Sequence, residues 1–153
     1  KFDNVLPKDK NHLVLVNPSN MGNLGTVIRS GAAFEIGGLA IIRPAADCFD
    51  PKCVRSSMGA IFSLPFHYYD TFEEYEKEFP THKLHPFMLQ ASKELSSVKK
   101  EEPYSLIFGN EATGLQREFL EKGDPIIIAQ SSLIDSLNLD NAVSIGLYTF
   151  KNK

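Results

Sequence analysis

The chain has 153 residues, 42% hydrophobic and 23% charged, a composition typical of one globular domain and not of a disordered or fibrous protein. A formal net charge of -3 gives no overall attraction to polyanions, so any nucleic-acid contact must come from a local group of Arg and Lys. The apolar runs are short, so we expect no membrane span or secretory leader, and we predict a cytoplasmic protein whose residues 1–153 form a single domain.

The N-terminal third predicts a strand, a helix and a second strand. Residues 12–16, HLVLV, read as a short buried strand that ends at turn-forming residues. The following helix has an apolar face that includes Leu24 and Ile28, and it ends before Gly37. Residues 39–42 form the second predicted strand.

The middle of the chain predicts two further helices around a strand. Asp50 can cap free backbone amides and Pro51 fits the first helical turn, so a helix carrying Arg55 should begin here. Residues 61–69 read as a strand, and residues 71–79 as an acidic amphipathic helix with a solvated face. The segment between the two histidines, His82 to His85, is interpreted as a loop and not as a pair of metal ligands.

The remaining segments complete an alternating pattern. Strands are expected at residues 86–90, 104–108 and 125–129, with a short helix over 115–121 and a closing helix over 139–150. This alternation predicts an α/β fold with a mostly parallel sheet and helices on both faces. Ligands of such sheets bind beyond the carboxyl ends of the strands. Cys48 and Cys53 are interpreted as free thiols, because a lone pair of cysteines in a chain without a leader seldom forms a bridge, and without a further Cys or a His at zinc spacing they cannot complete a zinc site.

Three segments carry polar residues that strand or helix formation does not require: 20–29, 109–114 and 135–141. In the second, two glycines bracket a carboxylate, which suits a backbone that approaches a ligand closely. Leu115 follows Gly114 where a nucleoside triphosphate loop would have Lys, and the glycine pattern of a dinucleotide site is incomplete. The residues alone therefore indicate an α/β ligand-binding enzyme and disfavour a phosphate-loop or dinucleotide enzyme.

Taken together, these segments resemble the three motifs of the SpoU, or TrmH, family of the SPOUT superfamily of RNA methyltransferases. The first motif is matched by residues 23–29 (NLGTVIR), the second by 108–115 (FGNEATGL) and the third by 128–143. Residues 55–62 (RSSMGAIF) resemble a family segment between the first two motifs. The order and spacing agree over nearly the whole chain.

The resemblance implies a SPOUT fold with a C-terminal deep trefoil knot, and a homodimer whose active site forms at the subunit interface. It implies transfer of a methyl group from S-adenosylmethionine to a ribose 2'-hydroxyl of tRNA or rRNA, leaving S-adenosylhomocysteine. No metal is implied. The cofactor would be held by ten residues: Leu89, Gln90, Ala91, Gly109, Asn110, Glu111, Gly114, Ile128, Ser136 and Leu137. For Ile128 and Leu137 the alternative is core packing, and for Gly109 it is a turn.

The resemblance also assigns five residues to catalysis: Arg29, Asn23, Glu111, Ser136 and Asn138. A ribose hydroxyl must be aligned with the methyl group and lose its proton as it attacks. A guanidinium is always protonated, so we interpret Arg29 as orienting the RNA and not as a literal base. The alternatives are helix caps for Asn23 and Asn138, a turn carboxylate for Glu111 and a surface ion pair for Arg29.

RNA would be contacted by five cations near the predicted site: Arg29, Arg43, Lys52, Arg55 and Arg117. Such residues supply contacts to phosphates and not sequence readout. The chain departs from the family pattern at Ala129 and Gln130, where Pro and an apolar residue are common, and at Asp140, where a small hydroxyl residue is common. These departures motivate the alternative hypothesis of an RNA-binding protein that has kept the fold and lost catalysis.

Overall fold

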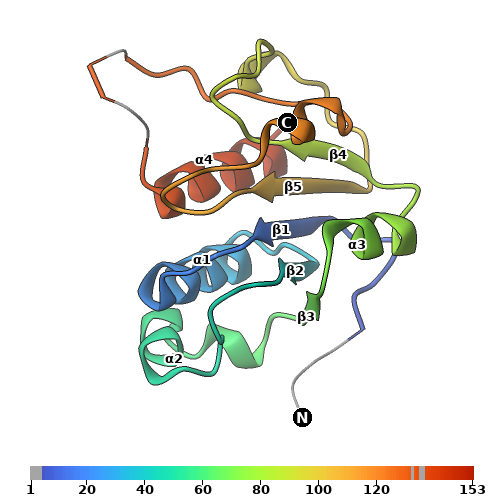
Figure 1. The fold of residues 1–153 in the computed structure, drawn as a ribbon. Helices are drawn as coiled ribbons and strands as arrows, with labels where there is room; N and C mark the ends of the chain where they lie inside the picture. Colours follow the sequence, from blue (N-terminus) through green and yellow to red (C-terminus); the bar gives the residue numbers. More distant parts are fainter. Residues whose placement is uncertain (1–4, 132, 135–136) are drawn as a thin grey trace.

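A five-stranded parallel sheet forms the centre of the computed structural model, which describes residues 5–131, 133–134 and 137–153 (Figure 1). Its strands are β1 (His12–Val16), β2 (Gly38–Ile42), β3 (Phe66–Tyr69), β4 (Lys83–Pro86) and β5 (Tyr104–Phe108). They lie in the order β3-β2-β1-β5-β4, and every neighbouring pair is parallel. The predicted parallel sheet is confirmed, and β1 and β5 match their predicted bounds.

Helices cover both faces of the sheet, as the sequence predicted. One face is packed by α1 (Met21–Ala33), α2 (Pro51–Ser57) and α4 (Leu139–Lys151), and the other by α3 (Phe72–Glu78) and the 3-10 helix η3 (Arg117–Glu121). Two further 3-10 helices are η1 (Ala60–Phe62) and η2 (Leu95–Ser97). None of the described helices is long and apolar enough to cross a membrane.

The two faces of the sheet are built by alternation along the central strands. In β1, Leu13 and Leu15 are buried against α1 and α4, whereas Val14 and Val16 are buried against α3. Successive side chains of a strand point to opposite faces, so a fully apolar strand can fill two layers of core at once. This double burial is the reason why HLVLV lacks the polar alternation of a half-exposed strand.

Three predicted elements in the middle and C-terminal parts were wrong. Only Phe66–Tyr69 of the expected strand 61–69 is extended, because η1 precedes it. The strand expected at 86–90 instead spans Lys83–Pro86, so the segment interpreted as a histidine loop belongs mainly to β4. Residues 125–129 form only isolated bridges to the loop after β4. The trefoil knot stays a prediction, and both cysteines are buried free thiols.

Two buried histidines lie at the amino-terminal end of the sheet, opposite the end at which ligands are expected. The Nε2 atom of His12 donates to the Pro7 carbonyl oxygen at 2.7 Å, and that of His82 donates to the Lys8 carbonyl oxygen at 3.0 Å. Their Nδ1 atoms lie 2.8 Å from the Tyr75 hydroxyl and 2.9 Å from the Ser105 hydroxyl, respectively. Burial lowers the pKa of both rings, that of His12 to about 4.

Candidate functional site

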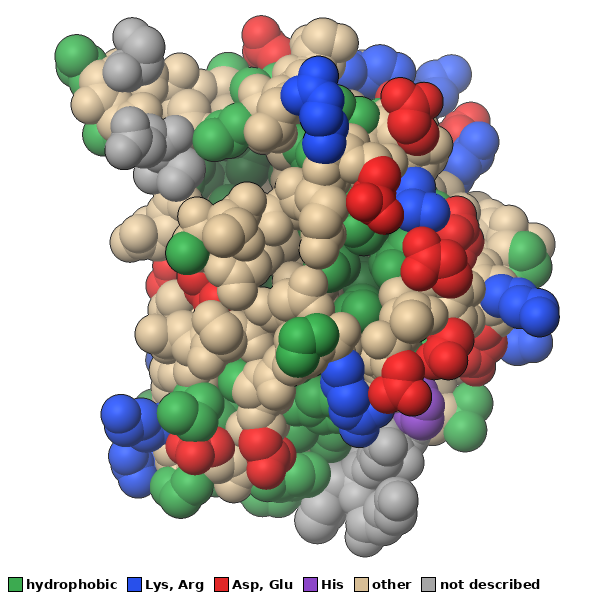
Figure 2. Space-filling view, in the orientation of Figure 1, with side chains coloured by type: hydrophobic (Ala, Val, Ile, Leu, Met, Phe, Trp, Pro, Cys, Tyr) green, Lys and Arg blue, Asp and Glu red, His purple; other side chains and the backbone are tan. Residues whose placement is uncertain are grey.

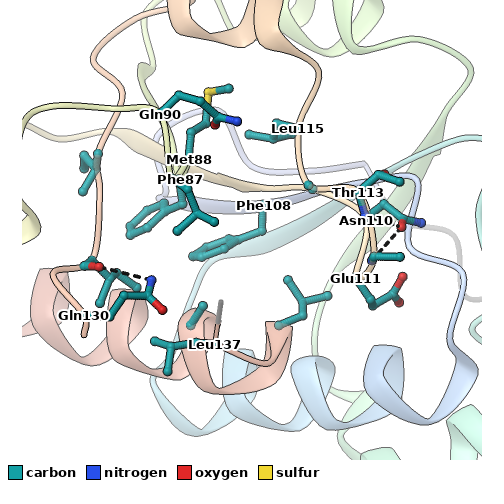
Figure 3. Close-up of a pocket in the computed structure, with 18 residues that line it drawn as sticks. Phe87, Met88, Gln90, Phe108, Asn110, Glu111, Thr113, Leu115, Gln130 and Leu137 are labelled. Atoms are coloured by element: carbon teal, nitrogen blue, oxygen red, sulfur yellow. Dashed lines mark hydrogen bonds between the residues drawn. The ribbon is translucent and has the colours of Figure 1, made fainter. Parts of the chain in front are cut away.

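A pocket of about 200 Å³ lies beyond the carboxyl ends of the neighbouring strands β4 and β5 (Figure 3). The chain forms it from three segments: residues 87–90 after β4, residues 108–115 at the end of β5, and the region from residue 126 to the first turn of α4. Parallel strands leave their carboxyl ends at one edge of the sheet, so loops that are distant in sequence converge there. The second and third predicted motifs meet at this pocket.

Stacked aromatic rings form part of the pocket wall. The rings of Phe87 and Phe108 lie 4.3 Å apart between centroids at an interplanar angle of 17°. Met88, Leu115 and Ile126 are buried and extend the apolar lining. Flat aromatic faces beside aliphatic side chains favour a ligand with a planar, largely apolar part.

The loop after β5 requires glycine at its first position. A Cβ atom on Gly109 would lie 2.3 Å from the carbonyl carbon of Gly114, because the loop folds back on itself there. Asn110 holds this conformation: its Nδ2 atom donates to the Asn17 carbonyl oxygen at 2.8 Å, and its Oδ1 atom accepts from the Ala112 amide at 2.8 Å. The loop therefore presents its backbone to the pocket in a fixed geometry.

Glu111 connects this loop to the start of α1. Its carboxylate accepts hydrogen bonds from the Asn20 amide at 2.9 Å, the Ser19 amide at 3.1 Å and the Ser19 hydroxyl at 3.0 Å. Burial acts to raise the pKa of Glu111, but the hydrogen bonds from Asn20 and Ser19 outweigh it and the pKa is lowered. A carboxylate whose charged form is held in this way is a poor proton acceptor, so its observed contacts are those of a positioning residue.

The first motif lies on α1, outside the pocket lining. Asn20, and not Asn23, caps this helix: its side chain accepts from the Asn23 amide at 2.9 Å. The capping alternative for Asn23 is therefore wrong, and its side chain is half-buried. Arg29 is exposed and makes no ion pair with the described part of the chain. An external anion would therefore meet no competing carboxylate among the described residues at this guanidinium.

Gly25 of the first motif has a packing role. A Cβ atom there would lie 1.8 Å from the Ser56 hydroxyl oxygen and 2.3 Å from the Cys53 carbonyl oxygen. Only glycine lets α1 and α2 approach this closely, which brings α2, where the family-like segment 55–62 of this chain begins, against the first motif. Gly25 thus serves the packing of two helices, and it brings no side chain to a ligand.

The start of α4 carries the remaining predicted residues. Asn138 is exposed at the N-cap position, but its side chain makes no capping hydrogen bond. The Oδ1 atom of Asp140 accepts from the Asn141 amide at 2.9 Å in the first helical turn, where the helix dipole favours a negative charge. This placement gives the departure at Asp140 a local structural reason. Ser136 lies outside the described residues.

Most of the residues predicted to hold the cofactor line the pocket. They are Leu89, Gln90, Gly109, Asn110, Glu111, Gly114, Ile128 and Leu137. Ala91 is not part of the lining, and Ser136 lies outside the described residues. The sequence did not assign the apolar wall to the site: Phe87 was placed inside the predicted strand 86–90, whereas it directly follows β4, and Phe108 ends β5 as predicted.

The predicted RNA-contacting cations differ in their surroundings. Lys52, Arg55 and Arg117 are exposed. Arg43 instead pairs with Asp70 at 3.2 Å and lies over the ring of Tyr68 at 4.9 Å. Figure 2 shows basic and acidic side chains intermixed over the viewed face.

A comparison with family models identifies the proteins to which this chain is related. The SpoU rRNA Methylase family model matches residues 10–148, which include all three motifs. The chain belongs to this family. The predicted resemblance is thereby confirmed.

Relatives and solved structures of the family agree with the fold. An uncharacterized tRNA/rRNA methyltransferase of Synechocystis sp. is 32% identical over 89% of this chain and 51% of its own length. A 23S rRNA (uridine(2479)-2'-O)-methyltransferase of Streptomyces viridochromogenes is 32% identical over 86% of this chain and 48% of its own length. The AdoMet-bound rRNA methyltransferase from Sinorhizobium meliloti superimposes with a TM-score of 0.89 at 27% identity, covering 97% of this chain and 58% of that chain. The chain thus spans about half the length of the curated relatives it matches.

Proposed function

We propose that this chain binds S-adenosylmethionine in the pocket beyond β4 and β5 and transfers its methyl group to a ribose 2'-hydroxyl of tRNA or rRNA. The convergence of the second and third motifs on one pocket, with the first motif tied to it through Glu111, carries the proposal. Relatives named as RNA methyltransferases and an AdoMet-bound neighbour of the same fold support it.

The pocket residues fit this cofactor better than a phosphate-bearing one. Among its described lining residues there is no Lys or Arg, and the single carboxylate is Glu111. The side chains that pair with phosphates are chiefly Lys and Arg, which the described lining does not offer. S-adenosylmethionine carries no phosphate, and its planar adenine matches the flat rings of Phe87 and Phe108.

When bound, S-adenosylmethionine supplies an electrophilic methyl group on a sulfonium. The ribose oxygen gains the methyl group and loses its proton, so the chain must align the hydroxyl and let the proton leave. Glu111 is occupied by Ser19 and Asn20 and is a poor base. We assign it the positioning of α1, and we assign Arg29 the orientation of the RNA phosphate next to the reacting ribose. Asn23, Ser136 and Asn138 stay candidates for contacts to that ribose.

The position of Arg29 supports a homodimer as the working form. Arg29 does not line the pocket of its own chain, so a second copy provides a way to complete the site. On α4, Ile145 and Tyr148 lie one turn apart with exposed fractions of 39% and 58%, which leaves an apolar strip for such a contact. Sedimentation analysis should give a dimer, and Tyr148→Glu should shift it toward the monomer, whereas Tyr148→Phe should not.

Calorimetric titration with S-adenosylmethionine and S-adenosylhomocysteine tests the cofactor assignment directly. Saturable binding by the folded protein is the expected result, followed by radiolabelled methyl transfer to tRNA or to ribosomal RNA fragments. Resistance of the labelled product to alkaline cleavage at the modified ribose identifies the 2'-oxygen as the acceptor. A folded protein that binds RNA but neither ligand would overturn the proposal and favour the catalytically silent RNA-binding protein.

A further inference from the structure

Gln130 places in the proposed cofactor pocket a buried polar atom that lacks a partner among the described residues. Its Nε2 atom donates to the Ile128 carbonyl oxygen at 3.4 Å, so the nitrogen, and not the oxygen, of the carboxamide meets this carbonyl. The Oε1 atom is shielded from solvent and has no hydrogen-bond partner within the described ranges of the chain. Buried acceptors in folded proteins are nearly always satisfied, and no described residue satisfies this oxygen, so it is open to a donor on a ligand in the pocket.

The surroundings of Gln130 restrict the kind of donor. Figure 3 shows its carboxamide close to Leu137 and beside the stacked rings of Phe87 and Phe108, with Glu111 on the opposite side of the pocket. A charged donor next to Gln130 would be desolvated among apolar groups and far from the carboxylate. A neutral donor on a planar ring avoids both the desolvation of a charge and the lack of a nearby counter-charge.

We propose that the Gln130 Oε1 atom accepts a hydrogen bond from the 6-amino group of the adenine ring of S-adenosylmethionine, and that it selects for a 6-aminopurine. The inference rests on the function proposed above. The other donors of the cofactor fit less well, because the α-ammonium group is charged and the ribose hydroxyls lie on a ring without flat apolar faces. The 6-amino group is neutral and lies in the plane of a ring that can pack against Phe87 and Phe108.

Gln130 differs from the family pattern, in which an apolar residue is common at this position. Recognition of adenine through the Gln130 side-chain oxygen would therefore add to the hydrogen bonds that the backbone of the pocket offers. Replacement of Gln130 by an apolar residue of similar length should therefore leave a working pocket that no longer distinguishes the 6-amino group by this contact.

Calorimetry on the full chain with two ligands tests the proposal. The ligands are S-adenosylhomocysteine and its analogue in which hydrogen replaces the 6-amino group. Gln130→Leu and Gln130→Met remove the acceptor in two different shapes, and Gln116→Leu, at an exposed position outside the pocket, is the matched control. We expect both Gln130 variants to bind S-adenosylhomocysteine about tenfold more weakly than wild type, which corresponds to about 1.4 kcal/mol. The affinity of both variants for the analogue with hydrogen in place of the 6-amino group should equal the affinity of the wild-type protein for it.

An equal loss for both ligands, or no loss for either, would overturn the role of Gln130. In those cases wild-type protein still binds S-adenosylhomocysteine, so the proposed function survives. If folded wild-type protein binds neither ligand, the proposed function fails and the inference falls with it. The two substitutions keep the test decisive when one variant does not fold, because thermal melting identifies that variant and the other provides the comparison.

Discussion

The Glu111 carboxylate lies 2.9 Å from the amide nitrogen of Asn20, and this hydrogen bond joins the loop after β5 to the residue that caps α1. Arg29 lies on the same helix, two turns further along. The placement of Arg29, which we assign to RNA, relative to the cofactor pocket therefore depends on Glu111, a carboxylate that lines this pocket and holds the start of α1. Changes at Glu111 should affect the alignment of both sites.

Replacement of Glu111 by Gln should weaken the hydrogen bonds to Ser19 and Asn20 while keeping a side chain of the same shape. The neutral amide is a poorer acceptor and cannot satisfy all the donors of Ser19 and Asn20, so we expect the free energy of unfolding to fall by about 1–3 kcal/mol. Methyl transfer should fall more than cofactor affinity, because α1 is displaced relative to the pocket. Urea unfolding and single-turnover assays measure the two effects. Glu118→Gln, at an exposed position of η3, is the control, and equal effects of both substitutions would contradict the positioning role.

Arg29→Ala should separate cofactor binding from methyl transfer. Because Arg29 is exposed and does not line the pocket, S-adenosylhomocysteine affinity should change less than about threefold. Transfer should fall by at least about a hundredfold, since the ribose would no longer be held in line with the methyl group. Lys77→Ala on the exposed part of α3 controls for a general loss of positive charge. Full transfer activity in the Arg29 variant would remove it from the site.

Mixing two inactive variants tests whether the site is shared between subunits. Gly109→Val should abolish cofactor binding, because its side chain would occupy the space of the Gly114 backbone. If Arg29 of one copy serves the pocket of the other, heterodimers of Arg29→Ala and Gly109→Val contain one site with both intact residues. Transfer activity should then recover to about a quarter to a half of wild type after exchange of subunits. An absence of recovery between variants shown to exchange would place Arg29 and the pocket in the same chain.

The sequence predicted best those elements whose signals are local. Buried apolar runs identified β1 and β5, and the Asp50–Pro51 pair identified the start of α2. The strand expected at residues 125–129 was wrong because Ile126 and Ile127 form only isolated bridges with the chain after β4, and the apolar side chain of Ile126 is buried where it lines the pocket. Periodicity cannot distinguish a strand from a single buried crossing segment.

The sequence motifs identified the residues of the site, but they did not reveal the physical role of each residue. The spacing of the second motif located Gly109 and Glu111, but the partners of Glu111 at Ser19 and Asn20 are more than 90 residues away in the sequence. No local pattern reveals such a contact. Likewise, Gly25 was identified as part of a motif, whereas its contact with Ser56 depends on how α1 packs on α2.

The close packing at Gly25 predicts unequal effects for two glycine substitutions in α1. Gly25→Ala places a methyl group against Ser56 and the Cys53 carbonyl, so the free energy of unfolding should fall by at least about 1–3 kcal/mol. At Gly22 the nearest atom to a new Cβ is the Asn20 Oδ1 atom at 3.3 Å, which must shift by a few tenths of an ångström, while alanine gains up to about 1 kcal/mol of helix propensity. Gly22→Ala should therefore change the free energy of unfolding much less than Gly25→Ala does. Similar destabilisation by both substitutions, measured by urea unfolding, would argue against a tight contact between α1 and α2.

Acidification should destabilise the fold through His12 and His82. Burial lowers the pKa of His12 from 6.5 to about 4 and also lowers that of His82, so between pH 6.5 and about 4 the unfolded chain binds more protons than the folded chain. The free energy of unfolding should therefore fall as the pH falls through this window, with His12 contributing up to about 3 kcal/mol. His12→Gln should be less stable than wild type at pH 7 but should lose less stability on acidification. Urea unfolding at half-unit intervals from pH 7 to 4.5 gives both curves, and parallel curves for wild type and variant would show that His12 is not held neutral by the fold.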